Sequence, residues 1–182
     1  MSDREIIALY KSGQQEKAFR VIVDTYSERL YWHVRHFLCS HEDADDLLQD
    51  IFLKIWNSLP GFRGEAKLYT WMFRIASNEA LNFLGKQRVR AAIQSDALPL
   101  ESAREVGADP FFNGDEAQGF LVRAISELPE KQRLVFIMRY LEEMPYEEIA
   151  EILNTSVGAL KASYHFAVNK IKKKLKKIES GD

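Results

Sequence analysis

The sequence contains a single cysteine and lacks any long apolar run. Cys39 is the only cysteine among 182 residues, so no disulfide can form within the chain, and the disulfide-rich secreted domains are excluded. No stretch approaches the roughly 18 apolar residues that a membrane-spanning helix requires. The first ten residues also lack the apolar core of a signal peptide. We therefore expect a cytoplasmic protein without membrane insertion.

Net charge is small as well, but the charged residues are unevenly distributed. The formal net charge is −2, and 46% of the residues are hydrophobic, a proportion that favours a folded chain over a disordered one. Acidic residues gather at 42–50 and 101–116, whereas basic residues gather at 86–90 and 161–177. This segregation predicts one surface that contacts nucleic acid and another that contacts protein.

Apolar residues recur at helical spacing, and the alternation typical of strands is absent. Between residues 93 and 118, serine, proline and glycine interrupt any long periodicity, which is typical of a linker. We therefore expect an all-α fold. It should comprise two small helical domains, residues 1–92 and 119–182, joined by a flexible linker at residues 93–118.

Residues 144–177 have the pattern of a helix-turn-helix followed by a basic tail. Pro145 suits the first turn of a helix, Asn154 tolerates the left-handed conformation of a tight turn, and Ser156 is a predicted N-cap. This arrangement can place the second helix in a DNA major groove, although an ordinary helical hairpin has the same pattern. The lysines at 170–177 favour DNA because they can neutralise phosphates.

The helix that Ser40 is predicted to cap carries an acidic face. Ser40 and Asp43 resemble a capping box, and a wide apolar stripe follows. Glu42, Asp46 and Asp50 recur at four-residue steps on the opposite side. Carboxylates on one face could hold Mg²⁺ in a nuclease, but no histidine or lysine completes such a site. We expect a docking face for a basic or polar partner, with a merely solvated helix face as the alternative.

The next segment combines a glycine loop with an aromatic helix. Phe62, Tyr69 and Phe73 lie near basic residues and could stack on unpaired bases, although aromatic residues at this spacing belong to a core first. Asn78 and Asn82 share one face and could hydrogen-bond such bases. Three other residues of this helix are expected in the core: Trp71, Ile75 and Leu81.

Four possible metal ligands lie close together in the sequence: His33, His36, Cys39 and His41. The spacing of three residues makes the first three drift around a helix rather than converge on one ion. Tetrahedral sites are usually completed by a second, distant ligand pair, and His165 alone does not supply one. We expect no bound metal and no cofactor.

Three segments, taken in order, resemble bacterial sigma factors of the sigma-70 family, extracytoplasmic function (ECF) group. They are Asp43–Trp56, the run Phe62-Arg63-Gly64…Tyr69-Thr70-Trp71…Arg74-Ile75-Ala76…Asn78, and Tyr146–Leu153. The resemblance covers about residues 15–90 and 115–177. It implies a protein that is not an enzyme but makes the RNA polymerase core promoter-specific, and it implies a possible anti-sigma partner.

The resemblance also implies which residues contact polymerase and DNA. The acidic helix would dock on a coiled coil of the largest polymerase subunit through Asp46, Gln49 and Asp50, and the C-terminal domain would contact the flap of the second subunit. The aromatic segment would open the minus-ten duplex and capture a flipped base. Its matching residues are Phe62, Asn78, Asn82, Lys86 and Arg88.

The second helix of the helix-turn-helix would read the minus-thirty-five element. The matching residues are Ser156, Lys161, Ala162, Ser163, His165 and Phe166. Many relatives carry arginines where this chain has Ser163 and Phe166. Fewer bidentate contacts to guanine are therefore available, and apolar contacts to thymine methyl groups can replace them.

Two other classes of function are weighed against this interpretation. A polymerase-independent helix-turn-helix regulator would usually bind a palindrome as a dimer, and the separate acidic helix disfavours it. A metal-dependent nucleic-acid enzyme would need a ligand set that the sequence lacks.

Overall fold

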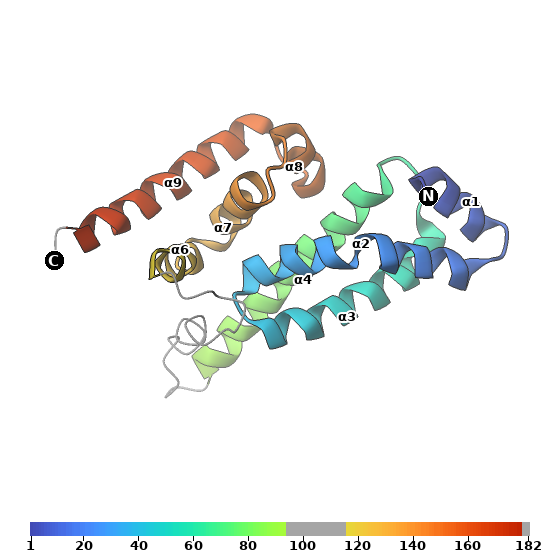
Figure 1. The fold of residues 1–182 in the computed structure, drawn as a ribbon, viewed down its shortest axis with the longest axis horizontal. Helices are drawn as coiled ribbons and strands as arrows, with labels where there is room; N and C mark the ends of the chain where they lie inside the picture. The colour runs from blue at the N-terminus through green and yellow to red at the C-terminus, as the bar shows by residue number, and fades with distance from the viewer. Residues whose placement is uncertain (94–115, 180–182) are drawn as a thin grey trace.

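The computed structural model describes residues 1–93 and 116–179, and every regular element in these ranges is helical. The N-terminal half (residues 1–93) contains α1 (Asp3–Lys11), α2 (Gln15–Leu38), α3 (His41–Ser58), the 3-10 turn η1 (Leu59–Gly61) and α4 (Leu68–Ile93). The C-terminal half (residues 116–179) contains α6 (Glu116–Ser126), α7 (Glu130–Phe136), the π-type turn η3 (Ile137–Leu141), α8 (Tyr146–Leu153) and α9 (Val157–Glu179) (Figure 1). The predicted all-α class is thus confirmed.

Most of the predicted linker lies outside the described residues. α4 continues to Ile93 and α6 begins at Glu116, so both helices reach into the segment that was assigned to the linker. The predicted domain boundaries remain predictions. None of the helices that the structure describes is long and apolar enough to cross a membrane.

The predicted helix boundaries are set by short-range signals. The Asp43 N–H donates to Ser40 Oγ (3.2 Å) at the start of α3, and the Ala159 N–H donates to Ser156 Oγ (3.2 Å) at the start of α9. Asn154 ends α8 with φ 49° in the left-handed region, as expected for the turn. Pro145 stands immediately before α8, one position earlier than predicted.

The core of the N-terminal half lies between α2, α3 and α4. Its fully buried side chains include Ile22, Leu30, Ile51, Ile55 and Met72. On α4, the buried residues Met72, Ala76 and Ala80 recur at four-residue steps and form its inward face. Three residues predicted for the core lie to the sides of this face and are only partly buried: Trp71, Ile75 and Leu81.

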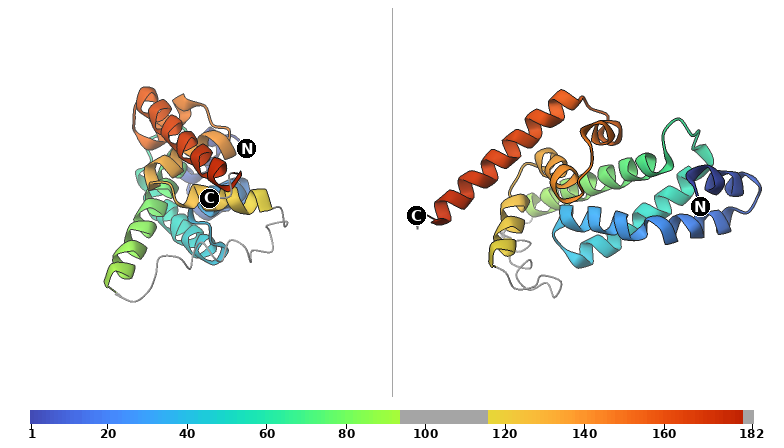
Figure 2. Two further views of the ribbon diagram at one scale, coloured as in Figure 1. Left: turned by 90° about the vertical axis from the view of Figure 1, so that its left-hand side faces the viewer. Right: turned by 45° about the horizontal axis from the view of Figure 1, so that its top comes forward.

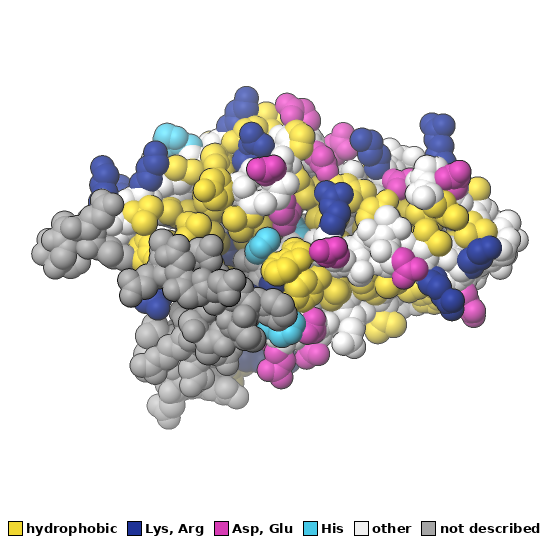
Figure 3. Space-filling model, in the orientation of Figure 1, with side chains coloured by type: hydrophobic (Ala, Val, Ile, Leu, Met, Phe, Trp, Pro, Cys, Tyr) yellow, Lys and Arg dark blue, Asp and Glu magenta, His cyan; other side chains and the backbone are white. Residues whose placement is uncertain are grey.

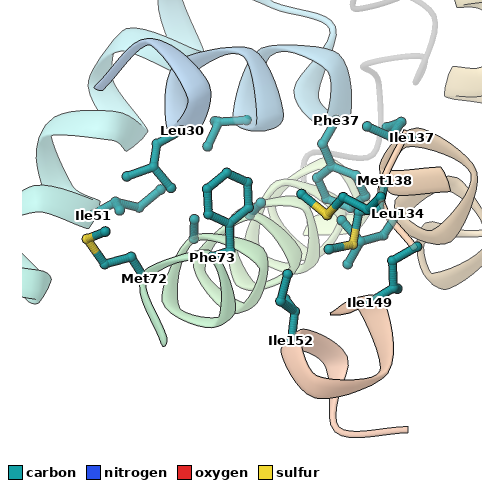
Figure 4. Close-up of a cluster of buried hydrophobic side chains, with 14 of the residues drawn as sticks. Leu30, Phe37, Ile51, Met72, Phe73, Leu134, Ile137, Met138, Ile149 and Ile152 are labelled. Atoms are coloured by element: carbon teal, nitrogen blue, oxygen red, sulfur yellow. The ribbon is translucent and has the colours of Figure 1, made fainter. Parts of the chain in front are cut away.

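The two halves pack against each other through one continuous apolar cluster (Figure 4). Phe37 of α2 and Phe73 of α4 face a group of buried side chains from the C-terminal half: Leu134, Ile137, Met138, Ile149 and Ile152. The further views show α7 and α8 seated against α2 and α4, with the end of α9 projecting away (Figure 2). The halves therefore share a core.

Buried polar contacts also join the halves. His33 of α2 is completely buried, and its Nδ1 lies 2.8 Å from Glu142 Oε1 while its Nε2 lies 3.0 Å from Ser77 Oγ. On α4, the Arg74 guanidinium donates to two carbonyls at the end of α8, those of Glu151 (2.6 Å) and Ile152 (3.3 Å). These bonds fix the helix-turn-helix against α4. His33, which was considered as a metal ligand, instead serves this interface.

Candidate polymerase-docking and nucleic-acid surfaces

The outer face of α3 carries the acidic row. Ala44, Leu47 and Ile51 point into the core, which leaves the opposite side of the helix in solvent. On that side the three residues predicted to dock on polymerase are all exposed: Asp46, Gln49 and Asp50. Within the residues that the structure describes, neither Asp46 nor Asp50 has an ion-pair partner. The row is therefore available to an external basic partner.

Leu53 adds an apolar group to this face that the sequence pattern did not single out. Its side chain is 61% exposed, and it follows Gln49 by four residues and Asp50 by three, so the three side chains are neighbours on the helix. A single exposed apolar residue is common on helix surfaces, so Leu53 adds an apolar contact to this face without by itself identifying a partner. The sequence could have identified Leu53 as an exposed apolar residue, because its position falls outside the apolar stripe of α3.

The structure brings three of the predicted minus-ten residues into one row on α4. Asn78, Asn82 and Lys86 recur at four-residue steps, and all three are exposed. Arg88 lies off this row and forms an ion pair with Glu130 of α7, although it is itself largely exposed. The row offers amide groups for bases and a cation for a phosphate. Arg88 also contributes to the contact between the halves, and its predicted role at the minus-ten element stays a prediction.

Phe62 lies in the loop before α4, partly buried, with its ring 5.1 Å from the ring of Trp71. The two other aromatic residues suggested as base platforms are not available for stacking. Phe73 is 1% exposed and belongs to the core, and the Tyr69 ring is covered by the Arg29 guanidinium at 4.5 Å. Phe73 therefore has the first of the two roles considered for these aromatic residues, that of a core residue.

Most predicted minus-thirty-five residues lie on the outer side of α9. Leu160, Ala167 and Ile171 bury the inner side, and Ser156 caps the helix. Lys161, Ala162, His165 and Phe166 are exposed, whereas Ser163 is partly buried. The sequence reading missed one neighbour on this side: the Asn169 side-chain amide lies 2.8 Å from His165 Nε2. An amide at this place can fix the ring orientation of His165.

The lysine tail continues the basic side of α9 (Figure 3). Lys170, Lys172 and Lys173 are exposed and suited to phosphate contacts. Lys174 differs, because it is partly buried and forms an ion pair with Glu127, the residue directly after α6. Desolvation lowers the pKa of Lys174 accordingly. This lysine joins α9 to the turn that follows α6, so the lysines of the tail are not uniformly available to DNA.

Two family models match the chain, one in each half. The model described as sigma-70 region 2 matches residues 22–90, and the model described as sigma-70, region 4 matches residues 121–171. The first match contains the acidic face of α3 and the α4 row. The second contains the helix-turn-helix and the outer side of α9.

Similar proteins cover nearly the whole chain. The ECF RNA polymerase sigma-E factor of Escherichia coli (strain K12) is 31% identical over 170 residues, which is 89% of this chain and 88% of that protein. The ECF RNA polymerase sigma factor SigW of Bacillus subtilis (strain 168) is 27% identical over 186 residues, with 98% of this chain and 99% of SigW covered.

Solved structures agree with these similarities. CnrH in complex with the cytosolic domain of CnrY superposes with a TM-score of 0.69 and 27% identity, covering 97% of this chain and 98% of CnrH. The sigma factor RpoE from Bartonella quintana, in complex with the anti-sigma factor NepR, has a TM-score of 0.66 and 24% identity, over 88% of this chain and 98% of RpoE. The chain therefore belongs to the sigma-70 family of RNA polymerase sigma factors and, within it, to the extracytoplasmic function group.

Proposed function

We propose that this sigma factor docks on core polymerase through α3, reads the minus-thirty-five element with α9 and opens the minus-ten element with α4. The observation that carries the proposal is the presence of three separate exposed surfaces at the positions of the family motifs. These are the acidic face of α3, the row Asn78, Asn82 and Lys86 on α4, and the outer side of α9. Each has the chemistry of its assigned partner: carboxylates for a basic protein surface, amides for unpaired bases, and lysines for phosphates.

Purified core polymerase provides the direct test. With this chain added, we expect transcription from promoters that contain both elements and none from templates that lack them. Binding to a palindromic site without polymerase would instead support a helix-turn-helix regulator. Cleavage of DNA in the presence of Mg²⁺ would support a nuclease. Either result, without polymerase-dependent transcription, would overturn the proposal.

An anti-sigma partner also belongs to this proposal. CnrH and RpoE, which share this fold, were both solved in complexes with a second protein. The two halves of this chain, joined by a shared core, offer a composite surface that such a partner could bind across. Recovery of polymerase subunits alone with the tagged chain from unstimulated cells would contradict the presence of this partner.

Replacing Asn78 or Phe62 with alanine is expected to reduce promoter opening more than duplex binding. Stacking contributes roughly 1–3 kcal/mol per base, so opening should fall by about 5- to 150-fold while closed-complex affinity changes little. Permanganate reactivity of minus-ten thymines reports the opening. Asn57→Ala, which removes an exposed amide at the end of α3, is the matched control and should open DNA normally. Normal opening by both test variants would rule out the pocket.

The outer side of α9 and its lysine tail should have separable effects on DNA binding. Changing Lys172 and Lys173 to glutamine should weaken binding equally for all sequences and reduce the salt dependence by roughly one unit of slope per lost phosphate contact. Changing Phe166 to serine should alter the preferred minus-thirty-five sequence by roughly 1–3 kcal/mol per base pair. Binding to a panel of promoter variants across a salt series distinguishes the two effects.

Lys11→Gln on α1 is the control for this series, because it removes an exposed lysine far from α9 along the chain. It should change neither the slope nor the preference. A changed sequence preference in the tail variant, together with an unchanged preference in Phe166→Ser, would reverse the assignment of the two surfaces.

A further inference from the structure

The first turn of α4 has no capping side chain of its own. The Trp71 N–H donates to the Lys67 carbonyl (3.1 Å), so Lys67 occupies the cap position, where serine, threonine, aspartate or asparagine is preferred. A lysine side chain offers no acceptor for the unpaired N–H groups of this turn, and its charge lies at the positive end of the helix dipole. α4 therefore begins without the local signal that starts α3 and α9.

Asp3 supplies the missing acceptor from α1. The Leu68 N–H donates to Asp3 Oδ2 at 3.0 Å, although 65 residues separate the two in sequence. The other carboxylate oxygen, Oδ1, accepts from the Tyr26 hydroxyl at 2.6 Å. One partly buried carboxylate thus joins α1, α2 and α4, and it places a negative charge where the α4 dipole favours it.

The surroundings hold this carboxylate in place. Ile6, one turn after Asp3, is completely buried and anchors α1 to the core. Burial, together with the bond to Asp3, raises the pKa of Tyr26, so its hydroxyl remains a donor. On the first turn of α4, the Tyr69 hydroxyl accepts from Arg29 Nη2 at 3.0 Å. The start of α4 is therefore fixed by two distant polar contacts, one from α1 and one from α2.

The loop before α4 depends on where this helix begins. Its first residue, Phe62, is held by the bond from its N–H to the Leu59 carbonyl (3.1 Å). Gly64, in the middle of the loop, has φ +77°, a left-handed conformation that glycine adopts readily. The far end of the loop is fixed where Asp3 caps α4. Loss of that cap would free the loop that presents Phe62 without touching Phe62 itself.

We infer that Asp3 is a positioning residue for promoter opening, an inference that rests on the proposed roles of Phe62 and Asn78. The Asp3 carboxylate sets the start of α4 and thereby the placement of the Phe62 loop relative to the Asn78 row. Asp3 lies outside both segments that the family models match, which begin at residue 22 and residue 121. The N-terminal helix thus acts on the minus-ten site through the backbone of another helix.

Three variants test this inference in the holoenzyme. Asp3→Ala removes the cap and should reduce opening of a duplex promoter by about tenfold, the typical effect of losing a hydrogen bond to a charged group. Asp3→Asn keeps an oxygen that can accept from Leu68 and should retain most of the opening. Glu16→Ala is the matched control: it removes an exposed acid from the first turn of another helix, α2, and leaves the capping of α1 and α4 intact. It should open DNA like the parent.

Further measurements separate positioning from a general loss of structure. A promoter with a mismatched, already open minus-ten region should restore transcription by Asp3→Ala, because the opening step is then bypassed. Hydrogen exchange should accelerate at the first-turn amides of α4 and remain unchanged in α3 and α9. Core affinity and minus-thirty-five binding should match those of the parent.

The inference is overturned if Asp3→Ala opens duplex DNA normally, if the mismatched promoter fails to restore its activity, or if core affinity falls in parallel. It is likewise overturned if Asp3→Asn is as defective as Asp3→Ala in opening DNA. These outcomes can be distinguished from the case in which the proposed minus-ten site itself is wrong. In that case Phe62→Ala and Asn78→Ala would also open DNA normally, whereas failure of this inference alone leaves those two variants defective.

Discussion

Changing Asp46 and Asp50 together to lysine is expected to weaken binding to core polymerase by at least about a hundredfold, because like charges brought together across an interface cost several kcal/mol. Both carboxylates are exposed, and the inward face of α3 is independent of them. The thermal stability of the chain should therefore change little, since exposed charges contribute little to folding. Titration of labelled core polymerase with the variant measures the affinity, and a melting curve checks the fold.

A matched double reversal on another helix provides the control for this result. Asp24 and Glu28 of α2 are also exposed and also four residues apart. Changing them to lysine alters the net charge by the same amount but should leave core affinity near that of the parent. Leu53→Ala should weaken core binding as well, and its effect should be insensitive to salt because the contact is apolar. Equal losses in both double reversals would indicate a nonspecific charge effect instead of docking through α3.

The helix boundaries were predictable because their signals are contained within a few residues. Ser40 and Ser156 each lie three residues before the N–H that they accept, and Asn154 marks its turn by its own tolerance of positive φ. The exposed faces of α3 and α9 were predictable for a similar reason. A helix that buries one side must leave the other exposed, and the period of the apolar residues shows which side that is.

The inward face of α4 was not predictable in this way. Apolar residues occur on nearly all sides of this helix, because α2 and α3 cover one side and α8 covers another. The polar row of α4 is narrow, so the helical period does not identify a single buried face. Trp71 was therefore placed in the core, whereas the structure buries Met72 there and leaves Trp71 partly exposed beside Phe62.

Contacts between residues far apart in the sequence were also unpredictable. His33 and Glu142 are 109 positions apart, and nothing near either residue indicates the other. The bond from Leu68 to Asp3 spans 65 positions in the same manner. Such pairs depend on how the helices pack, which a single sequence does not reveal. The packing of one half on the other is the largest feature of this kind.

Given the proposed roles of α4 and α9, this packing predicts that the two halves separate in the transcription complex. In the free chain, Arg74 of α4 contacts the end of α8, so the Asn78 row lies within a few helical turns of α9. The two promoter elements are centred about 25 base pairs apart, which at about 3.4 Å per pair is roughly 85 Å of duplex. The closed arrangement cannot place α4 and α9 on both elements of one promoter at once. If α4 and α9 have the proposed roles, the halves must therefore separate for both elements to be bound.

Separation exposes the shared apolar cluster and is unfavourable without a partner to cover it. Phe37, Phe73 and Met138 are each nearly or completely buried in the closed arrangement. Exposing a side chain of this size costs about 1.5–3 kcal/mol. Promoter DNA offers no apolar surface to compensate for several such side chains. We therefore expect core polymerase, rather than DNA alone, to separate the halves.

Spin labels at Val89 and Lys131 can measure this separation, because these exposed residues flank the ion pair between Arg88 and Glu130. With Cys39 changed to alanine, cysteines at the two positions should give a short distance in the free chain and in the chain with promoter DNA. The distance should lengthen by several tens of ångströms, about the difference between contacting helices and the promoter spacing, when core polymerase and promoter are both present. A second pair within the N-terminal half, at Glu28 and Asn57, should keep its distance throughout. An unchanged distance between Val89 and Lys131 in a complex that transcribes would show that the closed arrangement is itself active.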